Sequence, residues 1–425
     1  MALTGCAAAF APLSALARDL PGEAARLRDL LEQSETAAMR LDPLAAVRKG
    51  SETANSGPAF VDPLADVYWT TLRADKTREW NALQTIDRTL LPLVDQIAYD
   101  VFAYQLQLSL ALFEDDLFEI QRLTPFNPSF GLHVEFPDFV SGGAASFKSP
   151  ADYQRNLERL DGFADYLLNA ANLAEQGLAK GYKQPRIVIE AVLKQVDAML
   201  ATPATDSPFW SAIKRMPESF SAADKARLTE ECRSRITDKI YPGYRRWQSL
   251  LRDTYLPVAN AEPGRWAMKD GERLYGWELR GHTTTTLPPQ AIHDLGLSEV
   301  ARIRANMEKV RAKVGFAGDL PAFFEHIRTD PKFYYKTPEE LLARFEAIEA
   351  KIWPGIPKLF HNSPSAPFEV RPLPALGDQR GTGYYSAGPP DGKSPGILFF
   401  NMSMLNTRPI PTLETLTLHE GIPGH

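Results

Sequence analysis

The chain has 425 residues and a formal net charge of -6, and hydrophobic residues make up 44% of it. This is the composition of an ordinary globular protein, long enough for a large core and about two or three subdomains. No long basic run is present, so we expect no nucleic-acid partner. Two cysteines cannot form a disulfide framework or a zinc-thiolate cluster, and no apolar run approaches the roughly 20 residues of a membrane span.

Residues 1–19 are apolar and alanine-rich and carry features of an export signal. Residues 3–6 (LTGC) match the pattern at which bacterial lipoproteins are cut and lipidated, although only five residues precede Cys6. We expect the remnant of a signal whose true start lies upstream, with a lipid on Cys6 as the only membrane attachment and the periplasm or cell envelope as the location. An ordinary cleavage site at residues 15–17 (ALA) and a plain alanine-rich tail are the alternatives.

Residues 20–262 are predicted to form a helical domain. Ser149 has the features of a helix N-cap, and Gly181 is the expected end of that helix. Ser221 starts a second long helix, in which the Pro-Gly pair at 242–243 predicts a kink. Residues 77–120 are interpreted as a further helical stretch, and residues 42–63 as a surface loop.

Residues 263–425 are predicted to mix helices and strands. Residues 273–286 (RLYGWELRGHTTTT) alternate aromatic and β-branched residues as a strand does. A helix with apolar residues at 3-4-3-4 spacing follows and ends at Gly315, and Thr337 caps the next helix. The apolar residues of the first of these helices are Val300, Ile303, Met307, Val310 and Val314.

Three short strand candidates, residues 368–374, 381–388 and 396–403, precede a final helix that starts near Thr412. The expected fold is therefore mainly α, a long-helix bundle with a small antiparallel β-sheet next to the last helix. Residues 396–403 (GILFFNMS) are the strand nearest that helix in sequence. We expect them to form an edge strand whose unpaired backbone groups bind a peptide as an added strand.

The chain ends in LTLHEGIPGH, in which His419 and His425 are six residues apart. In a regular helix, histidines at i and i+4 can reach one zinc ion, whereas at i and i+6 they differ by about 240° and roughly 9 Å and point apart. Pro423 has no N–H for the carbonyl of His419, and Gly424 accepts unusual backbone angles. We therefore expect the helix to break between the histidines and to return His425 to a shared zinc ion.

Glu420 follows His419 and is the expected general base. Zinc lowers the pKa of its bound water to about 7, and a carboxylate can then take the proton during attack. A His-Glu pair alone arises often by chance. The alternative is a surface helix end with a Pro-Gly stop, where the helix dipole favours histidine.

Together with other segments, these residues resemble a bacterial family known as domain of unknown function 885. The resemblance covers most of the chain from about residue 20. It implies a mostly helical, zincin-like fold, a metallopeptidase or related metallohydrolase activity, and in many members export as a lipoprotein. It rests on LETLTLHEGIPGH and on GERLYGWELRGHTTTTLPPQAIHDLGLSEVARI, GFAGDLPAFFEHIRTDPKFYY, YYSAG and GILFFNMS.

The family motif normally continues past the second histidine with another His and then Leu-Gln. A catalytic zinc ion usually has three protein ligands plus water. The resemblance therefore implies that the third ligand lies beyond His425 and that this chain is an incomplete fragment. Such a fragment is expected to bind zinc poorly, to be inactive, and to expose apolar surface over residues 300–420.

Four further residues are candidates for contact with a substrate. A hydroxyl from Tyr384 or Tyr385 could stabilise an oxyanion, and strand alternation turns only one of the two toward a cleft. Asn401 could hold a substrate backbone group, and His282 could contact the substrate or support the site. For all four, a structural role is the alternative.

The sequence thus favours a zinc-dependent peptidase or metallohydrolase of the bacterial cell envelope, acting on a peptide or peptide-like substrate. The alternative is a non-catalytic helical envelope protein that has kept the fold. The zinc content of the full-length gene product would separate the two.

Overall fold

The computed structural model describes residues 22–50, 57–114, 116–143, 147–361, 366–373, 382–388, 392 and 395–425. The expected export segment and its Cys6 lie outside these residues. The chain divides into two compact units, with the change after Pro289, so residues 263–289 belong to the first unit. Among the described residues, no helix is both long enough and apolar enough to cross a membrane.

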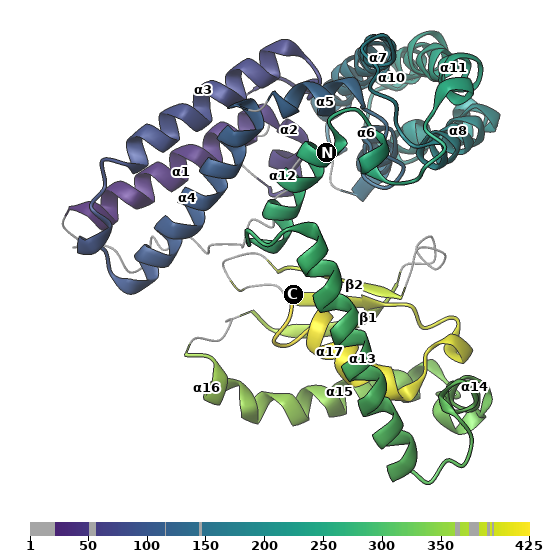
Figure 1. Cartoon of the computed structure of the whole chain (residues 1–425). Coiled ribbons are helices and arrows are strands. Elements are labelled where there is room, and N and C mark those ends of the chain that lie inside the picture. The colour runs from purple at the N-terminus through teal and green to yellow at the C-terminus, as the bar shows by residue number, and fades with distance from the viewer. Residues whose placement is uncertain are drawn as a thin grey trace. The chain divides into compact units, whose positions relative to one another are not determined.

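The first unit begins with helices α1 (Glu23–Leu41), α3 (Asp66–Leu83) and α4 (Leu93–Glu114), which lie side by side (Figure 1). They share a small core to which Leu27, Leu83 and Leu106 contribute fully buried side chains. The segment predicted as a surface loop contains the short helix α2 (Pro43–Arg48), because the side chain of Asp42 accepts a hydrogen bond from the backbone of Ala45 and caps it. Residues 51–56 of that segment lie outside the described part.

Helix α7 (Pro150–Ala179) is the centre of the largest core. Its predicted start is confirmed, since Ser149 and Asp152 form a reciprocal capping box. Its predicted end is confirmed too, at Gly181, whose φ of 85° suits glycine. The helices that contribute buried residues to the same core are α5 (Leu117–Leu123), α6 (Leu132–Asp138), α8 (Arg186–Ala201), α9 (Ser211–Lys214), α10 (Ala222–Ser234) and α11 (Tyr241–Ser249).

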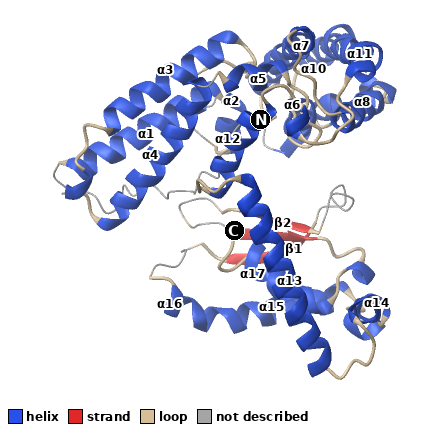
Figure 2. Ribbon diagram, viewed as in Figure 1, coloured by secondary structure: helices blue, strands red, loops and turns tan. Residues whose placement is uncertain are grey.

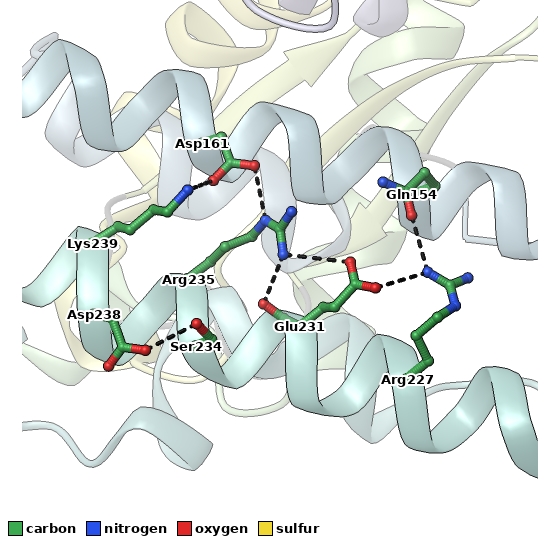
Figure 3. Close-up of polar contacts among 8 residues, drawn as sticks. All are labelled: Gln154, Asp161, Arg227, Glu231, Ser234, Arg235, Asp238 and Lys239. Carbon is green, nitrogen blue, oxygen red and sulfur yellow. Dashed lines mark hydrogen bonds and ion pairs between the residues drawn. The ribbon is translucent and has the colours of Figure 1, made fainter.

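Helices α10 and α11 belong to one helical run that starts at the predicted cap Ser221. A π-helical turn, Arg235–Ile240, ends two residues before Pro242, so the backbone irregularity lies just before the predicted kink. Figure 3 shows how this run is joined to α7 by polar contacts. The carboxylate of Asp161 accepts hydrogen bonds from Arg235 (2.9 Å) and Lys239 (2.6 Å).

Residues 273–286 were predicted to be a strand, and this is wrong: helix α12 (Gly271–Thr283) spans most of them. Leu274 and Trp277 are three residues apart and both buried, and the indole N–H of Trp277 donates to the carbonyl of Leu108 at 2.8 Å. This helical spacing of two large apolar side chains outweighed the strand propensity of the aromatic residues around them.

The second unit combines helices with a small sheet, as Figure 2 shows by colour. Helices α15 and α17 pack on one face of that sheet, where Phe345 and Phe400 meet edge to face at 5.0 Å. The predicted cap of α15 is confirmed, because Thr337 accepts from the backbone of Glu340. The helices of this unit are α13 (Pro289–Lys313), α14 (Leu320–Thr329), α15 (Pro338–Ile352), α16 (Ile356–Leu359) and α17 (Ile410–Glu420).

The sheet consists of β1 (Phe368–Pro372), β2 (Gly383–Ser386) and β3 (Gly396–Phe400) in the order β1-β3-β2. A small sheet beside the last helix is confirmed, but two details of the prediction are wrong. The sheet is mixed, because β1 pairs with β3 in parallel and β2 pairs with β3 antiparallel. Strand β3 is central instead of an edge strand, so its backbone pairs with β1 on one side and with β2 on the other.

Candidate metal centre

Helix α17 holds His419 and Glu420 in its last turn. Leu413 and Thr417, four residues apart, are buried against the rest of the unit and fix the rotation of the helix. His419 and Glu420 continue beyond this buried face, so His419 is exposed and Glu420 is partly exposed. A helix anchored along one side thus presents its C-terminal turn to the surface.

The expected helix break is confirmed, since α17 ends at Glu420. In a continuing helix the carbonyl of His419 would accept from the N–H of residue 423, but Pro423 has none. The backbone N–H of His425 donates to that carbonyl instead, at 3.0 Å. Only glycine fits before it, because a Cβ atom on Gly424 would lie 1.9 Å from the His419 oxygen. Pro423 and Gly424 together therefore turn the chain back onto the helix end.

This turn brings His425 beside His419, with the two ring centres 5.1 Å apart and the ring planes nearly perpendicular. One ligand atom from each of His419, Glu420 and His425 can be chosen so that all lie within 4.8 Å of one another. Ligand atoms around a tetrahedral zinc ion are roughly 3.3 Å apart, so small side-chain rotations would close the cluster. Two imidazoles and a carboxylate are also the nitrogen and oxygen donors that zinc accepts.

Phe368 at the start of β1 supports this turn, and sequence reasoning did not single it out. A Cβ atom on Gly421 would lie 2.8 Å from the tip of the Phe368 ring, so ring and turn are in close contact. No local pattern could have indicated this, because the two residues are far apart in sequence and meet only through the sheet. Phe368 pairs with Gly396 of β3, which places this end of the sheet beside the turn.

The two tyrosines of β2 lie on opposite faces of the sheet. Tyr385 pairs with Leu398, whose side chain is fully buried in the core shared with α15 and α17. Residues directly opposite each other on paired strands share a face, so Tyr385 faces the helices. Its hydroxyl lies over Gly396, where a Cβ atom would come within 1.9 Å of it. Tyr384 faces the other way, is 50% exposed and packs against Phe399.

The other two candidates lie in different surroundings. Asn401 is fully buried, and its side-chain oxygen accepts from the N–H (3.0 Å) and the hydroxyl (2.8 Å) of Ser403. In this structure its side chain shapes the turn after β3. His282 is exposed in the last turn of α12, in the first unit, whereas His419 belongs to the second.

Comparison with known proteins shows a match to one protein family and a fold shared with solved structures. The model of a family described as "Bacterial protein of unknown function (DUF885)" matches residues 43–425. A crystal structure of a "putative lipoprotein" from Colwellia psychrerythraea is similar with a TM-score of 0.77 and 21% identity, over 96% of this chain and 72% of that one. The structure of a "putative lipoprotein of unknown function" from Shewanella oneidensis is similar with a TM-score of 0.66 and 14% identity, over 96% of this chain and 71% of that one. No curated protein matches the chain.

Proposed function

The chain belongs to the bacterial family of unknown function DUF885, and on that premise we propose that it is a zinc-dependent hydrolase of peptide-like substrates. The observation that carries the proposal is the meeting of His419, Glu420 and His425 at one helix end, all within 4.8 Å of one another. A chance His-Glu pair would not require the backbone turn that returns His425.

His419 and His425 are the residues that would hold the ion, through one ring nitrogen each. When bound, zinc supplies Lewis-acid activation of water and of a carbonyl group. Glu420 is adjacent to His419 and partly exposed, so its carboxylate can accept a proton from water and later donate it to a leaving amine. Glu420 is close enough to be a ligand as well, and we assign it the role of base.

Tyr385 is the tyrosine that we propose as the oxyanion donor. It lies on the face of the sheet that carries α17, and its hydroxyl lies over Gly396. Gly396 pairs with Phe368, and Phe368 contacts the turn of residues 421–425, which we call the metal turn. A hydroxyl there can donate to negative charge that develops on a carbonyl oxygen. Tyr384 faces away and has no such role in our proposal.

An extended peptide is the substrate class that the sheet suits. β2 is an outer strand of the sheet, and no strand among the described residues pairs with its outer edge, so that edge can pair with a peptide backbone in place of β3. β2 also carries Tyr385, which would place the paired peptide next to the oxyanion donor. We propose the cell envelope as the location, because two structures with this fold are each described as a "putative lipoprotein".

The test is hydrolysis of a mixed peptide library by this chain and by the full-length gene product, with products identified by mass spectrometry. We expect cleavage by the full-length gene product that a chelator abolishes and added zinc restores. If neither chain cleaves any peptide and neither retains zinc after dialysis, the proposal fails, and a non-catalytic envelope protein remains.

A further inference from the structure

Arg408, just before helix α17, is partly buried and has no carboxylate partner among the described residues. Its guanidinium lies over the ring of Phe400, with Cζ 5.9 Å from the ring centre. In the described part of the chain it donates to two uncharged oxygens, the hydroxyl of Thr382 and the backbone carbonyl of Asn401, each at a long 3.4 Å. Burial lowers the pKa of Arg408, so its charge is partly withdrawn from water.

The lack of a countercharge distinguishes Arg408 within the second unit. Most of the described arginines of this unit pair with a glutamate: Arg302 with Glu299, Arg311 with Glu308, Arg328 with Glu325, Arg344 with Glu414 and Arg371 with Glu369. Arg304 has no such partner either, but it is exposed and solvated by water. A guanidinium has five N–H donors in a planar fork that matches a carboxylate, so Arg408 is suited to bind a carboxylate from outside the chain.

Arg408 lies on the same face of the sheet as Tyr385. Phe400, under the guanidinium, and Leu398 are two residues apart on β3 and therefore share a face. Tyr385 is paired with Leu398 and faces the same way. The unpartnered cation and the tyrosine that we propose as oxyanion donor thus lie along one side of β2.

The guanidinium and the metal turn lie at opposite ends of this face. Phe368, which contacts the metal turn, pairs with Gly396 at the first residue of β3, whereas Phe400 is the last residue of that strand. The hydroxyl of Tyr385 lies over Gly396. The four residues from Gly396 to Phe400 cover roughly 13 Å, which an extended peptide spans with about four residues.

The charge of Arg408 selects the direction of such a peptide. A peptide paired antiparallel with the outer edge of β2 ends with its C-terminus beside Thr382 and Arg408, because Thr382 directly precedes β2. A parallel peptide would bring its N-terminal ammonium to the same cation, where like charges repel. We propose that Arg408 binds the C-terminal carboxylate of the substrate, so that the enzyme releases C-terminal fragments of about four residues; this inference rests on the proposed hydrolase function.

The first experiment compares two peptides that differ only in a free or an amidated C-terminus, as substrates of the full-length gene product. We expect cleavage about four residues before the free C-terminus, and a kcat/KM at least about tenfold lower for the amidated peptide. An amidated peptide with aspartate as its last residue should be cleaved no faster than the other amidated one. Equal cleavage of the free and amidated peptides, or full recovery with the aspartate, would overturn recognition of a C-terminal carboxylate.

The second experiment assigns this preference to one residue. Arg408→Gln should lower the rate for the free peptide to that for the amidated one and leave the amidated peptide unaffected, while Arg408→Lys, which keeps the charge, should retain part of the preference. Arg304→Gln is the matched control, at an exposed arginine of the same unit. If amidation lowers the rate as much in Arg408→Gln as in the wild type, Arg408 does not bind the carboxylate.

The third experiment separates this inference from the proposed hydrolysis, because it measures binding of both peptides to the chelator-treated full-length protein by fluorescence anisotropy. The free peptide should bind at least about fivefold more tightly than the amidated one, and Arg408→Gln should remove the difference. This result would support Arg408 even if no peptide were cleaved, an outcome that counts against the hydrolase alone. Equal binding of the two peptides, or binding of neither, would overturn the role of Arg408.

Discussion

Glu420 lies close enough to both imidazoles to serve either as a base or as a ligand, and one substitution separates the two roles. For Glu420→Gln in the full-length gene product we predict that zinc affinity changes less than about threefold, because the histidines remain, while peptide hydrolysis falls about 10²- to 10⁴-fold through loss of the base. Both are measured on the same preparation, by calorimetric zinc titration and by product formation.

Glu346→Gln is the control for that experiment, because Glu346 is an exposed carboxylate on α15. It should leave zinc binding and turnover as they are in the wild type. Loss of zinc from the Glu420→Gln chain would make Glu420 a ligand, and full turnover with zinc bound would remove it from the reaction.

His133 gives a prediction about stability and pH. Burial lowers its pKa to about 4, with its Nε2 bonded to Gln195 at 2.9 Å. The unfolded chain therefore takes up a proton at a pH where the folded chain does not. The free energy of unfolding should be unaffected by this residue above about pH 6.5 and should fall by about 3 kcal/mol as the pH drops from 6.5 to 4.

Urea unfolding followed by tryptophan fluorescence between pH 7 and 4 measures this loss. His133→Gln should flatten the pH dependence, while His282→Gln, at an exposed histidine of the same unit, should keep it. An unchanged pH dependence in His133→Gln would show that His133 does not cause it.

Elements whose boundaries are set by neighbouring residues could be predicted from the sequence. Ser149, Ser221 and Thr337 cap their helices as expected, since a cap is a contact over three residues. The break of α17 was predictable for the same reason, because Pro423 removes the one donor that His419 needs. The order of the strands and the contact of Phe368 with the metal turn could not be predicted, since they depend on pairing between distant segments.

The exposed apolar stripe of α13, from Val300 to Val314, shows a different limit. Its spacing correctly indicated a helix, and apolar exposure in residues 300–420 was expected. A single sequence records that such a face needs a partner but does not identify the partner. In α12 the local signal was misleading, since aromatic residues favour strands unless distant packing selects a helix.

At the scale of the metal turn, Gly424 should be essential for the position of His425. Gly424→Ala places a methyl group against the His419 carbonyl and should open the turn. We expect zinc affinity to fall at least about tenfold, with a far-UV circular dichroism melt like that of the wild type, because the turn is not part of a core. Gly355→Ala, where a Cβ atom meets nothing within 4 Å, is the matched control. Unchanged zinc affinity in Gly424→Ala would contradict a role for this turn.

For the whole molecule, the division into two units predicts that zinc stabilises only the second unit, which contains His419 and His425. A ligand that binds only the folded state adds about 2.7 kcal/mol at 100 times its dissociation constant. We expect zinc to slow amide hydrogen exchange in peptides from residues 410–425 and to leave exchange within residues 22–250 unchanged. Equal protection of both units would show a zinc effect that does not arise at the α17 turn.

The most direct measurement is a zinc titration of the wild-type chain and three single variants by calorimetry. We predict one weak but saturable site per chain, as expected of two imidazoles without a third histidine, and we expect it to be weakened further, at least about tenfold, in His419→Ala and in His425→Ala, because each removes one of the two imidazoles. His361→Ala, at an exposed histidine of the same unit, should titrate as the wild type does. Equal zinc binding by all four chains, or none by the wild type, would contradict a metal centre at HEGIPGH.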